Sequence, residues 1–282
     1  MPLDTSKNYF VSRPDVYLRS SPGGGSKINH LLLGDWLRVL DPAHRNGSVK
    51  IRCRNDEGWL QADAFSEERA LEVNFVDIGQ GDGCHIVTPG DEIIVIDAGV
   101  GSNMNRFLSW RYNLRSRNVK RAPDFDSHEP EEEPWLIEHV VISHPDNDHY
   151  YGFRDVFENL KLKFATVYHN GIAERPDETE DPSLDYPDDL GGYATENGKR
   201  YVWDVIDTST KMKNLIKDHP DTRKQYLSTM RACVANTPGV TFKALSIDMD
   251  RLQQESYLGP FDPSGALSLR ILGPIAEKVS HQ

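Results

Sequence analysis

The stretch "IEHVVISHPDNDHYYG", residues 137–152, joins an apolar run to a cluster of histidines and aspartates. The run is apolar enough to predict a buried strand. Four potential metal ligands follow it: His144, Asp146, Asp148 and His149. Imidazole nitrogens and carboxylate oxygens suit borderline or hard divalent cations. Because α/β folds place their sites at the ends of such strands, the stretch predicts a metal centre there.

Strands and helices alternate on both sides of this stretch. Residues 71–99, "LEVNFVDIGQGDGCHIVTPGDEIIVIDAG", predict two strands around a glycine-rich turn. The segment "NRFLSWRYNL", residues 105–114, spaces Phe107, Trp110 and Leu114 for a helix that packs on the sheet. Residues 115–134 are expected to form an irregular loop, in which the glutamates of residues 129–133 are solvated. Further strands follow, and helices are expected over residues 153–163 and 222–239. The second helix has one apolar face, formed by Tyr226, Leu227, Met230, Cys233 and Val234. The pattern predicts a larger α/β domain over residues 70–282, with an acidic loop insertion around residues 174–200.

The N-terminal residues show a different sequence pattern. It predicts five short strands in residues 9–66 and a loop at "SPGGGS", residues 21–26. This pattern predicts a small all-β barrel, and we place its domain at residues 1–69. The segment resembles a bacterial SH3-like domain through Arg19–Ser20–Ser21–Pro22, Gly34 and Gly58–Trp59. The resemblance implies a module that binds peptides, cell-wall fragments or a neighbouring domain.

The amino-acid composition limits the kinds of protein that this chain can be. The 282 residues are 38% hydrophobic and 27% charged, as expected for a soluble globular protein. No apolar run is long enough to span a membrane, and the first residues do not resemble a secretory signal. Three distant cysteines predict reduced core thiols and a cytoplasmic location. The net charge of −12 argues against a surface that is basic throughout, although a local nucleic-acid site remains compatible with it.

Three motifs in order resemble the metallo-β-lactamase fold, and most closely the hydrolase domain of bacterial DNA-uptake channel (competence) proteins. They are "FVDIGQGDG" (residues 75–83), "VIDAG" (residues 95–99) and "SHPDNDHYYG" (residues 143–152). The last corresponds to the family's H-x-H-x-D-H motif, with Asp146 in place of its second histidine. The resemblance implies the N-terminal half of an αββα sandwich.

The resemblance also implies roles for individual residues. His144 and Asp146 would bind one divalent metal, and Asp148 and His149 a second. Asp148 would also act catalytically, by orienting the attacking hydroxide. Asp97 would hold a ligand histidine in place, or it could instead cap a helix or turn. Because Asp146 adds an oxygen ligand, manganese competes with zinc for the first position.

The family completes its centre with further histidines and an aspartate from its second half, and no such motif follows Pro274. His169 is the best substitute, with His219, Asp248 and His281 weaker. We therefore expect half a site, in a fragment, in one chain of a split enzyme that a C-terminal segment or partner chain completes, or in a degenerate relative. The chain alone should bind metal weakly and have little activity, since a catalytic zinc normally keeps three protein ligands.

The expected reaction is hydrolysis, and the substrate class is open among phosphodiesters, thioesters and lactones. The DNA-uptake resemblance favours a nuclease or phosphodiesterase. So does the segment "RFLSWRYNLRSRNVKR", residues 106–121, which has six basic residues, no acid and several aromatics. Such a segment could hold a nucleic acid, or it could be an ordinary amphipathic helix. The alternative to an enzyme is a non-catalytic scaffold whose N-terminal domain recruits a partner.

Overall fold

The computed structural model describes residues 3–175, 190–248 and 256–276, and the chain forms two compact units. Unit 1 comprises Met1–Glu72 and Val87–Asp91, and unit 2 comprises Val73–Ile86 and Glu92–Gln282. Each unit has a hydrophobic core of its own.

Unit 1 is the expected all-β region, built as a seven-stranded sheet in the order β3-β2-β6-β5-β4-β1-β7. Its strands are β1 (Asn8–Val11), β2 (Val16–Ser21), β3 (Gly24–Leu31), β4 (Trp36–Arg45), β5 (Ser48–Cys53), β6 (Asp56–Gln61) and β7 (Phe65–Ser66). Alternate residues such as Leu18, Ile51 and Leu60 point inward and are almost completely buried.

The prediction of a loop at residues 21–26 is wrong. Ser21 still belongs to β2, and Gly24 already begins β3, so only Pro22 and Gly23 form the turn. Gly23 and Gly25 have φ of 74° and 82°, values that favour glycine. The glycines thus build a tight, irregular hairpin, and the strand that follows them was missed.

Unit 2 is organised around a six-stranded sheet in the order β15-β12-β11-β10-β9-β8. Its strands are β8 (Glu72–Val76), β9 (Gly83–Val87), β10 (Ile93–Ile96), β11 (Trp135–Val141), β12 (Leu162–His169) and β15 (Thr241–Ala244). β10, β11, β12 and β15 run parallel, with Ile96 opposite Val141 and Val141 opposite Tyr168. The run predicted as a buried strand at residues 137–143 is therefore the strand β11, which ends at Val141 and lies between β10 and β12. The glycine-rich region upstream contains three strands rather than two.

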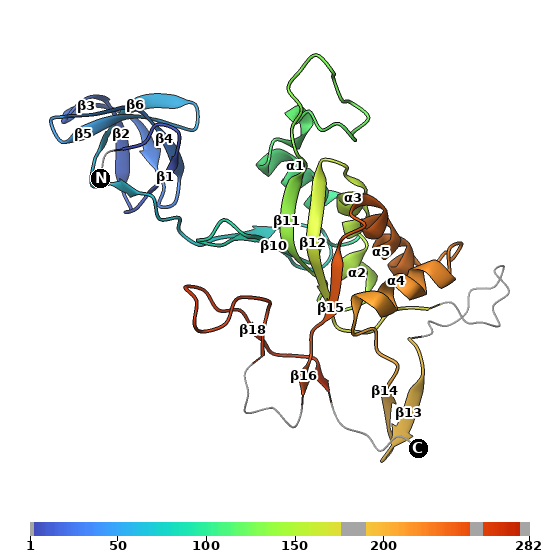
Figure 1. Cartoon of the computed structure of the whole chain (residues 1–282). Coiled ribbons are helices and arrows are strands. Elements are labelled where there is room, and N and C mark those ends of the chain that lie inside the picture. The colour runs from blue at the N-terminus through green and yellow to red at the C-terminus, as the bar shows by residue number, and fades with distance from the viewer. Residues whose placement is uncertain (1–2, 176–189, 249–255, 277–282) are drawn as a thin grey trace. The chain divides into compact units, whose positions relative to one another are not determined.

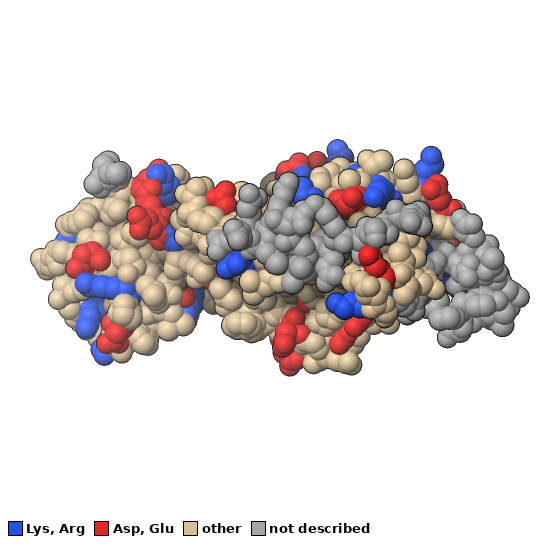
Figure 2. Space-filling model, turned by 90° about the horizontal axis from the view of Figure 1, so that it is seen from below, with Lys and Arg blue, Asp and Glu red and all other residues tan. Residues whose placement is uncertain are grey.

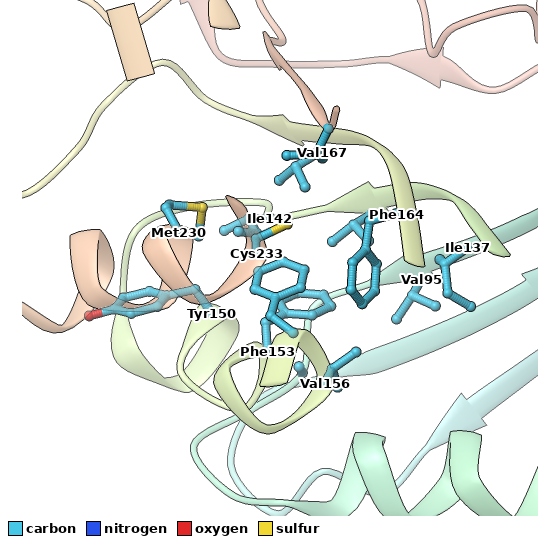
Figure 3. Packing of buried hydrophobic residues seen from close by; sticks show 14 of the residues in the cluster. Val95, Ile137, Ile142, Tyr150, Phe153, Val156, Phe164, Val167, Met230 and Cys233 are labelled. Carbon is cyan, nitrogen blue, oxygen red and sulfur yellow. The ribbon is translucent and has the colours of Figure 1, made fainter. Parts of the chain in front are cut away.

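The helices of unit 2 are α1 (Asn103–Arg111), α2 (Asn147–Tyr150), α3 (Phe153–Glu158), α4 (Ser209–Asp218) and α5 (Gln225–Asn236), with a 3-10 turn at Leu114–Ser116. Figure 1 shows α3, α4 and α5 together on one side of the parallel strands. Their apolar side chains form one core with the sheet, in which Phe153, Phe164 and Cys233 are fully buried (Figure 3). The predicted apolar face of α5 packs into this core.

Residues 256–271 cover part of the opposite face of the sheet. Leu258 and Phe261 pack there against Ile94, Val141 and Tyr168. This segment contains the short strands β17 (Ser256–Tyr257) and β18 (Arg270–Ile271). Two further strand pairs are β13 (Tyr193–Glu196) with β14 (Lys199–Val202), and β16 (Ile247–Asp248) with β19 (Ile275–Ala276).

The helix predicted at residues 105–114 packs on the core of unit 2 as expected, with Phe107 against that core and Leu114 buried in it, whereas the expected burial of Trp110 is wrong. Met104 and Leu108 are the buried residues of α1, whereas the side chain of Trp110 is 78% exposed. The expected helix over residues 153–163 ends at Glu158, because Leu162 begins β12. Most of the acidic insertion, residues 176–189, lies outside the described residues.

Two further expectations concern membranes and thiols. Among the described helices, none is both long and apolar enough to cross a bilayer.

All three cysteines are free thiols. Burial raises the pKa of Cys53 to about 11 and also raises the pKa of Cys84 and Cys233. Cys53 and Cys233 are buried, as expected of core residues, whereas Cys84 is half-buried.

Candidate metal centre

Three parallel strands bring the candidate residues to one edge of the sheet. Asp97 follows β10, residues 142–149 follow β11, and His169 ends β12. The backbone N–H of Asp97 donates to the carbonyl of Val141 at 3.0 Å. The carboxyl ends of neighbouring parallel strands are the usual place for a site in an α/β sheet.

Asp97 is buried and makes the best-defined polar contacts at this edge. Its Oδ1 accepts from the Ser143 N–H at 2.9 Å, and its Oδ2 accepts from the Ser143 hydroxyl at 2.6 Å. The same Oδ2 lies 2.8 Å from Nδ1 of His149. Asp97 has a φ of 53°, a left-handed conformation that Asp tolerates better than most residues. The turn after β10 therefore aims a buried carboxylate at the segment after β11.

The four ligand candidates form two pairs. Nε2 of His144 lies 3.4 Å from Oδ2 of Asp146, and Nε2 of His149 lies 3.8 Å from Oδ1 of Asp148. The two imidazole rings have centroids 3.7 Å apart. Since Asp97 occupies Nδ1 of His149, the Nε2 of that ring is the nitrogen available to a cation. The family resemblance groups the same residues as ligands of two metals, and this grouping stays a prediction.

Close backbone contacts hold the three sequence motifs together. A Cβ on Gly81 would lie 2.6 Å from the carbonyl oxygen of Asp148, and one on Gly152 would lie 2.2 Å from that of Ala98. The backbone N–H of Ala98 donates to the carbonyl of His149 at 2.8 Å. The glycines are required because any side chain would separate these turns.

Sequence reasoning missed Gln80, which lies in the first of these turns. Its Nε2 donates to Oδ2 of Asp148 at 3.4 Å. Asp77 accepts a local bond from Gly79 N–H, and the side chain of Asp82 is exposed. The position of Gln80 between the two glycines Gly79 and Gly81 was the available indication, because such a turn approaches other backbone closely.

The other histidines do not join the four candidates. His169 is 1% exposed, its Nδ1 accepts from Gly171 N–H at 3.2 Å, and burial lowers its pKa to about 4. His85 bonds Tyr112 and Asn74, and His139 packs against Tyr168 and Phe261. His219 ends α4, the side chain of Asp248 is not described, and His281 lies outside the described residues.

The described residues fit a divalent metal in the kind of donor, in their pairing and in the orientation of His149. They do not fit in number, since each pair supplies two donors and a catalytic zinc keeps three protein ligands and a water. In the described part of the chain, no group of three or more His, Cys, Asp or Glu side chains converges as a ligand set. No catalytic step through a metal follows from these residues alone.

The basic segment at residues 106–121 is partly neutralised. Arg117 lies 3.6 Å from Glu132, and Lys120 lies 3.8 Å from Glu131. Arg121 donates to the carbonyls of Leu160 and Asn236. The glutamates at residues 131–132, which were expected to be solvated, thus pair with this segment. The exposed Trp110 remains beside the basic residues of α1.

Comparison with known proteins gives one match. A sequence model described as the metallo-beta-lactamase superfamily matches residues 84–229. No curated protein and no solved structure matched the chain. Membership of this superfamily indicates a metal-dependent hydrolase in general, and its members usually bind divalent metals, typically zinc. The matched segment spans half of the chain and contains Asp97 and the cluster at residues 144–149, so the chain belongs to the metallo-beta-lactamase superfamily.

Proposed function

We propose that this metal-dependent hydrolase cleaves phosphodiesters, and that donors beyond the four described candidates complete its metal centre. The observation that supports a metal centre is the bond between His149 and the buried Asp97. A carboxylate that fixes one imidazole nitrogen commonly orients a histidine whose other nitrogen binds metal. Ser143 reinforces this geometry, because it donates two hydrogen bonds to the same carboxylate.

His144 and Asp146 would hold one ion, and Asp148 and His149 the other, with Gln80 holding the carboxylate of Asp148. When bound, two divalent ions supply a Lewis acid for a phosphoryl or acyl oxygen and a water whose pKa lies near 7. The oxygen ligand Asp146 makes manganese a competitor for zinc at the first position.

Two features support phosphodiesters over thioesters and lactones. One is the resemblance to the hydrolase domain of DNA-uptake channel proteins, carried by the motifs at residues 75–83, 95–99 and 143–152. The other is α1, which carries the exposed Trp110 together with Arg106 and Arg111 and is followed by Arg115 in the 3-10 turn. An aromatic ring beside cations can stack a base while the cations hold the phosphates. We propose single-stranded nucleic acid as the partner of this helix, and a bacterial SH3-like barrel for residues 1–69.

The first test measures metal uptake by the 282-residue chain. Zinc and manganese are titrated calorimetrically into the wild type, into His149→Ala, and into the control His128→Ala, whose histidine is exposed. We expect weak uptake of fewer than two ions, lost in His149→Ala and unchanged in His128→Ala. Uptake that is unaffected by His149→Ala would contradict the proposed centre.

The second test identifies the reaction. Labelled single-stranded and duplex DNA, a thioester and a lactone are incubated with the metal-loaded chain. Slow, metal-dependent DNA cleavage that His149→Ala abolishes supports the proposal. Hydrolysis of the thioester or lactone with intact DNA would refute the phosphodiester assignment.

One observation favours a second function, a non-catalytic scaffold. The described residues bring no three metal ligands together. A chain that neither takes up metal nor hydrolyses any of these substrates would support the scaffold. Two tight sites per chain would instead show that donors elsewhere in the same chain complete the centre.

A further inference from the structure

Unit 1 has a pocket of about 190 Å³ on the outer face of its sheet. Strand alternation explains the position, because Leu18, Leu60 and Val49 point into the core while their neighbours point outward. The outward neighbours that line the pocket are Tyr17 and Arg19 of β2, Trp59 and Gln61 of β6, and Ser48 of β5. Arg19 pairs directly with Trp59, and Ser48 with Gln61.

The pocket has one arginine that no carboxylate neutralises. Arg13, at the rim, is held by Asp63 at 3.0 Å and also bonds Gln61. Arg19 donates to the carbonyl of Gly25 at 3.1 Å, and it forms no ion pair with any described carboxylate. A guanidinium has five donors in a planar fork, so Arg19 retains donors for a carboxylate.

The walls beside Arg19 are aromatic and are themselves flanked by cations. Nζ of Lys27 lies 3.5 Å from the centroid of the Tyr17 ring, and Cζ of Arg45 lies 5.5 Å from that of Trp59. Ser48 accepts from Gly23 N–H at 3.1 Å, and a hydroxyl can also donate to a second partner. Tyr17 also stacks on His30, with ring centroids 4.7 Å apart, so Trp59 is the wall that a carbon stem can reach. An acidic group in the pocket would therefore meet the donors of Arg19, with the ring of Trp59 beside its carbon stem.

We propose that this pocket binds an acidic side chain of an extended peptide, with the carboxylate on Arg19 and the stem against the ring of Trp59. The volume supports one side chain, because pockets for drug-sized molecules are roughly 300–1,000 Å³. A planar carboxylate also matches the fork of an arginine in a bidentate pair.

Charge favours a peptide over a nucleic acid at this site. Residues 1–72 contain ten Lys and Arg against ten Asp and Glu, so unit 1 carries no excess positive charge. Figure 2 shows basic and acidic side chains interspersed over the face that it draws.

The test measures peptide binding to the full chain by fluorescence anisotropy. The probes are a short capped, rhodamine-labelled peptide with one central glutamate, the same peptide with glutamine, and labelled oligothymidylate. The proteins are the wild type, Arg19→Gln, Arg19→Lys, and the control Arg52→Gln, whose arginine pairs with Glu57 and does not line the pocket.

The glutamate peptide should bind about tenfold more tightly than the glutamine peptide, since a charge-assisted hydrogen bond contributes at least this factor. Arg19→Gln should remove the preference, Arg19→Lys should keep part of it, and Arg52→Gln should leave it unchanged. Equal binding of both peptides, no effect of Arg19→Gln, or no peptide binding would each overturn the proposal. Oligothymidylate binding that depends on Arg19 would assign the pocket to nucleic acid instead. Circular dichroism of each variant separates these results from unfolding.

Discussion

Asp97 accepts hydrogen bonds from the Ser143 N–H and hydroxyl and contacts Nδ1 of His149, and it is only 4% exposed. Replacing one carboxylate oxygen by an amide turns an acceptor into a donor. In Asp97→Asn, either Ser143 or His149 would lose its partner, and the ring of His149 would no longer be fixed.

We expect Asp97→Asn to weaken zinc or manganese binding by about 10–100-fold, the usual effect of removing such a partner. Titration calorimetry measures this, with Asp155→Asn as the control because Asp155 is exposed on α3. If Asp97→Asn binds metal as tightly as the wild type, Asp97 stabilises only the turn after β10 and does not orient a metal ligand.

His169 provides a pH-dependent test at the same scale. Burial lowers its pKa from 6.5 to about 4, so the folded state holds it neutral where the unfolded chain binds a proton. The sign follows: this contribution to stability is complete above pH 6.5 and is lost as the pH falls towards 4. The loss amounts to about 3 kcal/mol at most.

His169→Asn keeps an acceptor for the N–H of Gly171 and removes the titration. Urea unfolding at several pH values should show a smaller loss of unfolding free energy between pH 7 and pH 4 in this variant than in the wild type. The control is His128→Asn, an exposed histidine that should retain the wild-type slope. Identical slopes in the wild type and His169→Asn would mean that folding does not lower the pKa of His169.

At the scale of elements, α1 presents a large aromatic side chain to solvent. Trp110 is 78% exposed, although its spacing in the sequence predicts burial. The helix buries Met104 and Leu108 instead, which rotates Trp110 away from the sheet. Exposed tryptophans beside arginines are typical of surfaces that stack bases.

If α1 binds single-stranded nucleic acid, Trp110→Ala should weaken oligothymidylate binding by about tenfold, since a stacked base contributes about 1–3 kcal/mol. Raising the salt concentration should weaken the remaining binding further. The control is Trp36→Ala in β4, where the side chain is 47% exposed. Equal losses in both variants would indicate non-specific contact, and no loss in Trp110→Ala would remove α1 from the interface.

At the scale of the whole molecule, the chain divides into two units with separate hydrophobic cores. A mutation in one core is therefore expected to act within its own unit. Leu18 is completely buried in the core of unit 1. Leu18→Ala should destabilise this unit by about 2–5 kcal/mol.

Hydrogen exchange followed by mass spectrometry would locate the effect. Peptides from β2, β5 and β6 should lose protection, while those from β11 and β12 keep it. A loss of protection throughout both units would show that the two cores unfold together.

The periodicity of apolar residues in the sequence predicted those helices and strands whose apolar residues are buried. Most of the run at residues 137–141 is buried within β11, so its apolar composition identifies a buried strand. The face of α5 with Tyr226, Leu227 and Met230 is likewise buried as predicted. Where glycines allow several conformations, as at residues 21–26, the pattern predicted a loop and the chain formed a hairpin. Residues 24–31 form a strand because they pair with β2, and this pairing cannot be predicted from a local property of the sequence.

The sequence also predicted which kinds of donor atom the candidate centre contains, because the donor types and their position after a buried strand are local properties. The hydrogen-bond partners of these ligand candidates could not be predicted in this way. The contacts of His149 with Asp97 and of Asp148 with Gln80 join residues more than fifty positions apart. Likewise, Glu131 and Glu132 meet Lys120 and Arg117 only because the loop folds back. The sequence by itself determined an α/β unit with ligand residues at a strand end. Tertiary structure alone decided which side chains face one another, because strand order and loop paths set those distances.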